Sequence, residues 1–120
     1  MKVGTRALVA VAAGAIATGK APSPIYDYSE GGYRTVSGTA ATGRINLYDH
    51  VEGAYFTGSG NGSHFSLYDY GQGAHVTLDM NGNQFSGYDY GTGNHFNGRV
   101  SGRNVSIYDY GEGAYFNYVL

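Results

Sequence analysis

The chain has 120 residues, enough for one domain, and a formal net charge of −2, so it lacks the basic surplus of a nucleic-acid-binding protein. It contains 21 glycines and 13 tyrosines but no cysteine, which excludes a disulfide framework and a zinc site with thiolate ligands. Because each glycine inside a helix costs roughly 1 kcal/mol relative to alanine, this composition favours β-strands joined by turns.

The first 17 residues differ in kind from the rest of the chain. Lys2 and Arg6 precede an alanine-rich apolar run that ends in Ala15-Ile16-Ala17, a pattern typical of a cleavable secretion signal. The run is too short to span a bilayer, which needs about 20 residues. We predict a secretion signal over residues 1–17 and a flexible leader over residues 18–25. The alternative is a frayed or helical N-terminus of a cytoplasmic protein.

From residue 26 onward the chain is repetitive. Residues 65–84 read FSLYDYGQGAHVTLDMNGNQ, and residues 85–104 read FSGYDYGTGNHFNGRVSGRN. The repeat aspartates lie twenty residues apart, except that the first lies twenty-two residues before the second; they are Asp27, Asp49, Asp69, Asp89 and Asp109. The domain over residues 26–120 divides into copies near 26–44, 45–64, 65–84, 85–104 and 105–120. A fixed period of this length indicates stacked repeats.

Each copy contains two strands and two turns. A glycine stands three residues before each hydrophobic residue that begins a strand or its second half, which predicts turns with positive φ. The predicted turn glycines are Gly53, Gly62, Gly73, Gly82, Gly93, Gly102 and Gly113. Alternation of apolar and polar residues predicts the inward face. The predicted core is Phe56, Phe65, Leu67, Val76, Leu78, Phe85, Phe96, Val100, Val105, Ile107 and Phe116.

The fold class that this pattern predicts is all-β, a β-solenoid of about five strand–turn–strand repeats. The two strands of a copy would lie back to back in two facing parallel sheets, with equivalent residues about 4.8 Å apart in a cross-β stack. Tyrosines would then form outer ladders: Tyr48, Tyr68, Tyr88 and Tyr108, and beside them Tyr70, Tyr90 and Tyr110. The opposite parity, with tyrosines inside, is the alternative. The open ends of such a stack would recruit further molecules.

The same parity turns the repeat aspartates inward as a ladder of five carboxylates. Two charges 4.8 Å apart repel by roughly 3.5 kcal/mol at an effective dielectric constant near 20. Three explanations remain open: each aspartate accepts N–H bonds from its own turn, the ladder shares protons, or a cation such as Ca²⁺ lies between layers. We assign no metal and no cofactor. His75 and His95, which occupy the same slot of adjacent copies, are interpreted as solvated side chains.

The repeats resemble those of curlins, the subunits of bacterial curli fibres. The resemblance depends on Tyr88-Asp89-Tyr90-Gly91-Thr92-Gly93-Asn94 and on residues 107–114, IYDYGEGA, which are similar to the family's Gln-x-Gly-x-Gly-Asn core. Every copy has aspartate where the family has glutamine, and only Asn94 retains the asparagine. The resemblance implies a self-assembling subunit of extracellular amyloid fibres, with a nucleator and a secretion pore as partners.

We therefore predict a secreted structural subunit on the cell surface of a Gram-negative bacterium. It would assemble end to end with itself into curli-like fibres of the biofilm matrix and would support adhesion. No nucleophile–base pair is indicated, so we expect no enzymatic activity, and the charge predicts no nucleic-acid partner. The alternatives are a small outer-membrane β-barrel and a monomeric solenoid that binds a surface.

Overall fold

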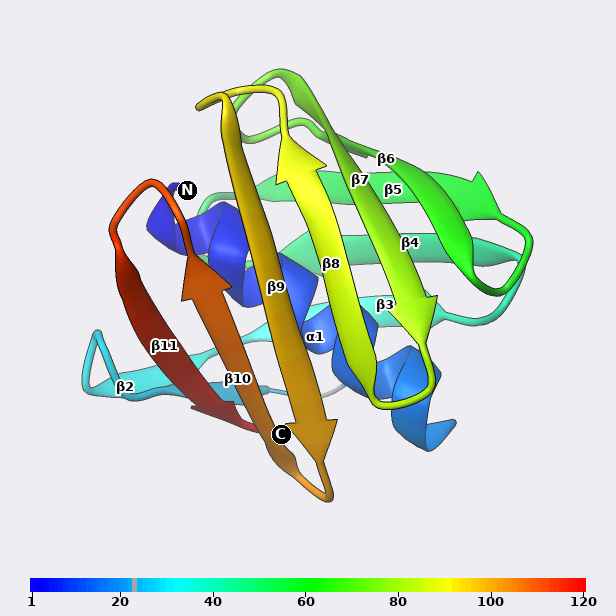
Figure 1. Ribbon diagram of the computed structural model, residues 1–120, viewed down its shortest axis with the longest axis horizontal. Helices are drawn as coiled ribbons and strands as arrows, with labels where there is room; N and C mark the ends of the chain where they lie inside the picture. The colour runs from blue at the N-terminus through cyan, green and yellow to red at the C-terminus, as the bar shows by residue number, and fades with distance from the viewer. Residues whose placement is uncertain (23) are drawn as a thin grey trace.

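The computed structural model describes residues 1–22 and 24–120 and shows a helix enclosed by an eleven-stranded sheet (Figure 1). Helix α1 spans Val3–Thr18. The strands are β1 (Ile25–Asp27), β2 (Gly32–Arg34), β3 (Val36–Ala40), β4 (Arg44–Asp49), β5 (Ala54–Gly60), β6 (His64–Asp69), β7 (Ala74–Asn81), β8 (Gln84–Asp89), β9 (Asn94–Ser101), β10 (Asn104–Asp109) and β11 (Ala114–Val119). No helical segment in this described part of the chain has the length and hydropathy needed to cross a bilayer.

The strands form one antiparallel sheet that curls almost into a closed barrel. Their order is β2-β1-β11-β10-β9-β8-β7-β6-β5-β4-β3, so that β1 and β11, far apart in sequence, are neighbours. The two edge strands, β2 and β3, are separated in the chain by Thr35 alone. A single bent segment therefore connects both edges of the sheet. Helix α1 runs through the space that the sheet surrounds (Figure 1).

The predicted β-solenoid with two facing parallel sheets is wrong, and so is the cross-β stack. The two strands of a copy lie side by side as a hydrogen-bonded hairpin, in which Leu67 faces Val76. The cause is the turn between them: the Gly73 N–H donates to the Asp69 carbonyl oxygen at 2.8 Å, and Gly73 has a φ of 70°. This tight loop returns the chain to the same sheet. Successive copies consequently lie side by side around an axis.

The two extra residues of the first copy have a structural counterpart. In the middle copies, the residue seven places after one repeat aspartate faces the next aspartate, as Val76 faces Asp89. In the first copy, it is the residue nine places after Asp27 that does so, because Val36 faces Asp49. The same wider offset recurs where the last copy pairs with β1. Since closure of a barrel requires a stagger between strands, the irregular spacing coincides with the place where the barrel closes.

The inward faces of the strands and helix α1 together form the core. Ten of the eleven residues predicted for the core are at most 3% exposed, and only Phe116 is half-buried. The helix contributes a continuous buried stretch that includes Val9 and Val11. A helix that is apolar on all sides needs such complete enclosure. The residues predicted to form a removable signal are, in this structure, the centre of the molecule.

The predicted turn glycines and the predicted leader can be located in the structure. All seven predicted turn glycines have φ between 60° and 93°, the left-handed region in which glycine is favoured. Of the predicted leader, Thr18 ends α1, Ile25 begins β1, and Ser23 lies outside the described residues. Cleavage of the chain after Ala17 stays a prediction.

Replacement of Phe96 by alanine should lower the free energy of unfolding by about 3–5 kcal/mol, because it leaves a cavity in a packed interior. Phe96 is 1% exposed, whereas Tyr115 is 67% exposed. Urea denaturation of Tyr115→Ala, the control, should show a loss of about 1 kcal/mol or less. Equal losses for the two variants would contradict the assigned inward face.

Candidate functional site

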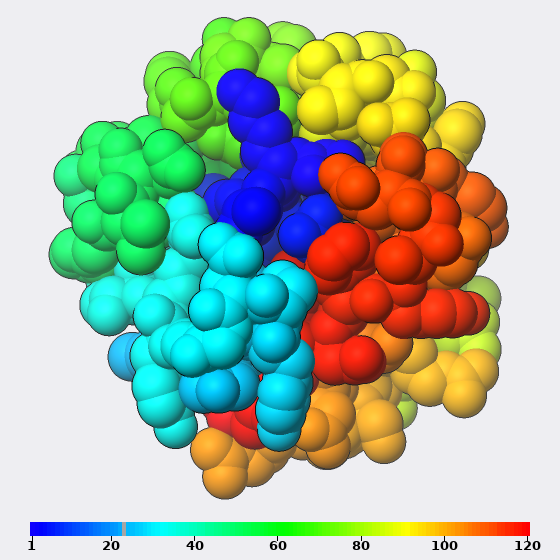
Figure 2. Space-filling view, turned by 90° about the vertical axis from the view of Figure 1, so that its left-hand side faces the viewer, coloured from blue at the N-terminus to red at the C-terminus, as the bar shows by residue number. Residues whose placement is uncertain are grey.

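The five repeat aspartates gather at one end of the barrel. Each is the last residue of its strand, on β1, β4, β6, β8 or β10, and each is at most 3% exposed. These five strands point the same way along the barrel, so the carboxylates form a ring around its axis. The predicted solenoid would have placed them in a column along a fibre. We call this set the aspartate ring. In Figure 2 the N-terminal residues lie at the centre of the circle formed by the successive copies.

One oxygen of each aspartate caps the turn that follows its strand. The Oδ1 atom accepts the backbone N–H of the residue two places ahead, at 2.9–3.0 Å in every copy. This is the Asx-turn geometry that aspartate before glycine favours. The first of the three explanations for the inward carboxylates is therefore confirmed. The sequence signal for it was aspartate two residues before the first glycine of Gly-x-Gly.

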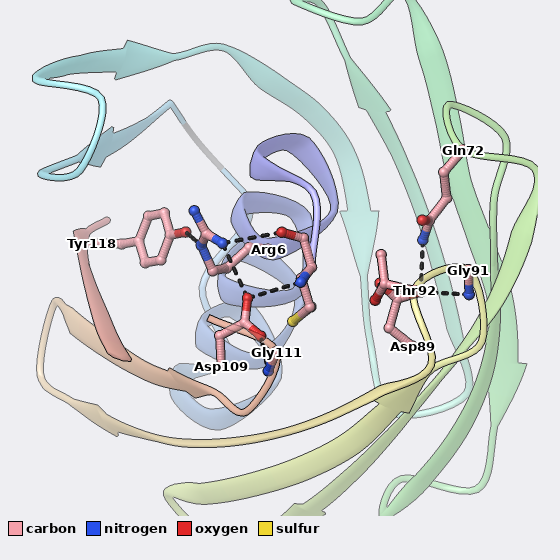
Figure 3. A network of polar contacts seen from close by, with 9 residues as sticks. Arg6, Gln72, Asp89, Gly91, Thr92, Asp109, Gly111 and Tyr118 are labelled. Carbon is pink, nitrogen blue, oxygen red and sulfur yellow. Dashed lines mark hydrogen bonds and ion pairs between the residues drawn. The ribbon is translucent and has the colours of Figure 1, made fainter. Parts of the chain in front are cut away.

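The second oxygen of two of these aspartates binds the beginning of α1. The Thr5 hydroxyl donates to Asp69 Oδ2 at 2.5 Å, and the Arg6 guanidinium donates to Asp109 Oδ2 at 3.1 Å. The Met1 ammonium also donates to Asp109 Oδ2, at 2.9 Å (Figure 3). The positive end of the helix dipole lies on the same side. The ring thus holds the N-terminal turns of the helix by charge and hydrogen bonding.

The other carboxylates find partners within the sheet and its turns. Arg34 donates to Asp49 Oδ2 at 2.7 Å, and the Thr92 hydroxyl donates to Asp89 Oδ2 at 3.0 Å. Asp27 Oδ2 is buried and has no hydrogen-bond partner in the described residues. Four of the five buried carboxylates therefore have both oxygens satisfied, which offsets much of their mutual repulsion.

The environment of Asp109 changes its acidity. Burial raises the pKa of its carboxyl group, but the hydrogen bond and charge of the Met1 ammonium, together with the Gly111 N–H and the Arg6 guanidinium, outweigh burial and leave the pKa below its ordinary value. Among the described residues, no group of three or more histidine, aspartate or glutamate side chains is placed to hold a metal.

An aromatic belt surrounds the same end of the barrel on its outer side. Around Tyr68, the rings of Tyr70 and His75 pack edge-on, with centroids 4.7 and 4.9 Å away. Similar groups repeat around the barrel, and the belt consists of Tyr26, Tyr28, Tyr33, Tyr48, His50, Tyr55, Tyr68, Tyr70, His75, Tyr88, Tyr90, His95, Tyr108, Tyr110 and Tyr115. The predicted tyrosines do face outward, but they pack within each hairpin and do not stack into ladders.

Several members of the belt that the sequence did not associate with these tyrosines come from the second strand of a hairpin. Tyr55 faces Tyr48 across the β4–β5 hairpin, and His95 faces Tyr88 across β8–β9. A back-to-back arrangement separates these pairs, whereas a hairpin of this loop length brings them together. One histidine–carboxylate pair, His64 with Asp79, also arises from cross-strand pairing on β6 and β7. Both of its side chains are exposed.

The outer wall beyond the belt is polar on the hairpins β4–β5, β6–β7 and β8–β9. The next outward positions along the hairpins are occupied by Asn46, Thr57, Ser66, Thr77, Ser86 and Asn97, and the following ones by Arg44, Ser59, His64, Asp79, Gln84 and Arg99. Hydroxyl and amide groups therefore border the aromatic rings on the exposed side of the sheet.

Comparison of the chain with family models, with curated proteins and with solved structures finds no match. The resemblance to curlins stays a prediction.

Replacement of Asp109 by asparagine should lower the free energy of unfolding at pH 7 by about 3–5 kcal/mol, because Arg6 then loses its buried charge partner. The lowered pKa means that the native state favours the ionised carboxylate, so its contribution is present at neutral pH. That contribution is lost as the pH falls through the folded-state pKa, which lies below the ordinary value of an aspartate.

Thermal unfolding measured from pH 7 to pH 2 should therefore show a difference between wild type and Asp109→Asn that shrinks in acid. The exposed Asp79→Asn change is the control and should cost about 1 kcal/mol or less. A difference that stays constant over this pH range would contradict the assigned role of Asp109.

Proposed function

We propose that this protein is an extracellular, non-catalytic binding protein that adheres to neutral polysaccharide through its outer wall. The observation that carries the proposal is the aromatic belt, in which Tyr70, Tyr90 and Tyr110 are 60%, 62% and 55% exposed. Burial of so many exposed rings against a partner would be favourable, and a monomer gains nothing by exposing them.

The composition of the outer wall resembles that of a recognition surface. Tyrosine provides large, rigid contact area at low conformational cost, while serine, asparagine and glycine provide adaptable hydrogen bonding, as in antibody paratopes. Here the belt supplies the tyrosines, and the next positions, such as Ser66 and Asn97, supply the hydroxyl and amide groups. The negative face of an aromatic ring also suits contact with the C–H groups of a sugar ring.

The charge pattern favours a neutral partner. Beyond the belt, the fixed charges on the hairpins β4–β5, β6–β7 and β8–β9 are those of Arg44, Asp79 and Arg99, with both signs present. A wall with so few fixed charges, of both signs, gives little attraction for a polyanion or a polycation. A neutral polymer of hydroxyl groups matches both the rings and the amides.

The earlier alternatives fare differently. The small outer-membrane β-barrel alternative matches the barrel-like fold of the chain. Its placement in a membrane needs an apolar band on the outside, and the outward positions beyond the belt on β4–β9 are polar instead. Assembly by end-to-end stacking depended on the solenoid and has lost its geometric basis. Export stays part of the proposal, supported by Lys2, Arg6 and the Ala15-Ile16-Ala17 segment; recovery of the native protein only from the cytoplasmic fraction would contradict it.

The triple variant Tyr70→Ser, Tyr90→Ser and Tyr110→Ser should bind neutral polysaccharide at least about tenfold more weakly, which corresponds to about 1.4 kcal/mol. The physical reason is the loss of three exposed ring surfaces. Affinity electrophoresis in gels that contain a soluble β-glucan or dextran would measure the effect, with dextran sulfate as the charged comparison.

The control is a second triple variant at the opposite end of the barrel, Asn81→Ser, Asn83→Ser and Asn104→Ser, which should bind as the wild type does. Thermal unfolding of both variants verifies that the barrel is intact. Failure of the wild type to bind any neutral polysaccharide, or equal binding by the tyrosine variant, would refute the proposal.

A further inference from the structure

We infer that the lumen of the barrel is a binding site for an apolar helix, and that α1 occupies it as a tethered ligand which an identical helix supplied in trans can replace. This site is separate from the outer wall and does not depend on the proposed binding of polysaccharide.

The sheet makes its strand pairings without the helix, with β2 and β3 as its two edges. All strand pairings from β3 through β11 to β1 and β2 are made within the sheet. In the described residues, no backbone hydrogen bond joins α1 to a strand. The helix is held by side-chain contacts and by the ion pair of the Met1 ammonium with Asp109, much as an amphipathic or apolar helix is held in the groove of its receptor.

The lumen is mainly an apolar container for the middle of the helix. Residues 7–13 of α1 are at most 3% exposed and belong to the same core cluster as the inward residues of the hairpins. Contacts of α1 reach strands on different sides of the barrel, among them β3, β7 and β10. Contacts of this kind select a helix that is apolar on all faces and has small side chains.

The polar end of the lumen gives the site a direction and a specific requirement. Arg6 donates through Nε to the Tyr118 hydroxyl at 3.2 Å and through Nη1 to Asp109 (Figure 3). Its guanidinium carbon lies 3.5 Å from the centroid of the Phe116 ring. Arg6 is 3% exposed. Asp69 accepts the Thr5 hydroxyl beside it. The site therefore recognises an arginine and a hydroxyl group near the N-terminus of the helix.

The other end of the helix is open to the outside. A hollow of about 610 Å³ reaches Val11 and Ala15 on α1 and is bordered by Lys20, Pro24 and Leu120. It lies where the connection from α1 to β1 leaves the barrel. This short connection is the helix's covalent link to the sheet, so cutting it converts α1 into a bound peptide.

The inference is tested on the whole folded chain, with the recognition site of a specific protease inserted after Ala21. After folding and cutting, the N-terminal peptide should elute together with the barrel in gel filtration. A fluorescein-labelled peptide of residues 1–21 should then replace it at one peptide per barrel, measured by anisotropy after mild urea treatment and refolding. The Arg6→Ala peptide should bind at least about tenfold more weakly.

Two controls complete the design. The uncut chain should take up no labelled peptide, because its lumen is occupied, and a scrambled peptide of the same composition should bind to neither form. The inference is overturned if the cut barrel takes up no labelled peptide after unfolding and refolding in its presence. It is equally overturned if the scrambled peptide or the Arg6→Ala peptide binds as well as the natural one.

Discussion

The structure depends on the apolar contact between helix α1 and the inner faces of the hairpins. A single hairpin with one apolar face is at best marginally stable in water, and the copies acquire a core only when they share one. Barrels of about eight strands are just filled by their own side chains, whereas wider ones leave space. With eleven strands in a nearly closed sheet, that space exists, and α1 fills it. The repeats and the helix are therefore two parts of one core.

The repeat aspartate links this core to the turns. Its Oδ1 atom fixes the loop that makes each copy a hairpin, and in two copies its Oδ2 atom binds Thr5 or Arg6 of the helix. One residue type thus serves local turn formation and the placement of α1. The arrangement also explains how so many buried carboxylates coexist: they cap N–H groups and meet the positive end of the helix instead of facing one another.

Much of the local structure could be predicted from the sequence, and the global arrangement could not. Alternation along residues such as Val76, Leu78 and Met80 predicts the buried face, and the glycines predict turns with positive φ, as found. A twenty-residue period with two strands, however, is compatible with stacked parallel coils and with antiparallel hairpins. The hydrogen bond from Gly73 to Asp69 decides between them, and loop length alone did not show it. The apolar N-terminus was interpreted as a signal, so the predicted fold lacked the helix around which the repeats close.

The central claim is that the repeats close around α1. Isotope-edited NMR of the intact chain tests it most directly, by cross-relaxation between backbone protons of Tyr26 and Val119, which face each other across β1 and β11, and between the methyl groups of Val9 or Val11 and those of the inward residues of the sheet. The account predicts both sets of cross-peaks. Their absence, with contacts only between equivalent residues of successive copies, would contradict it.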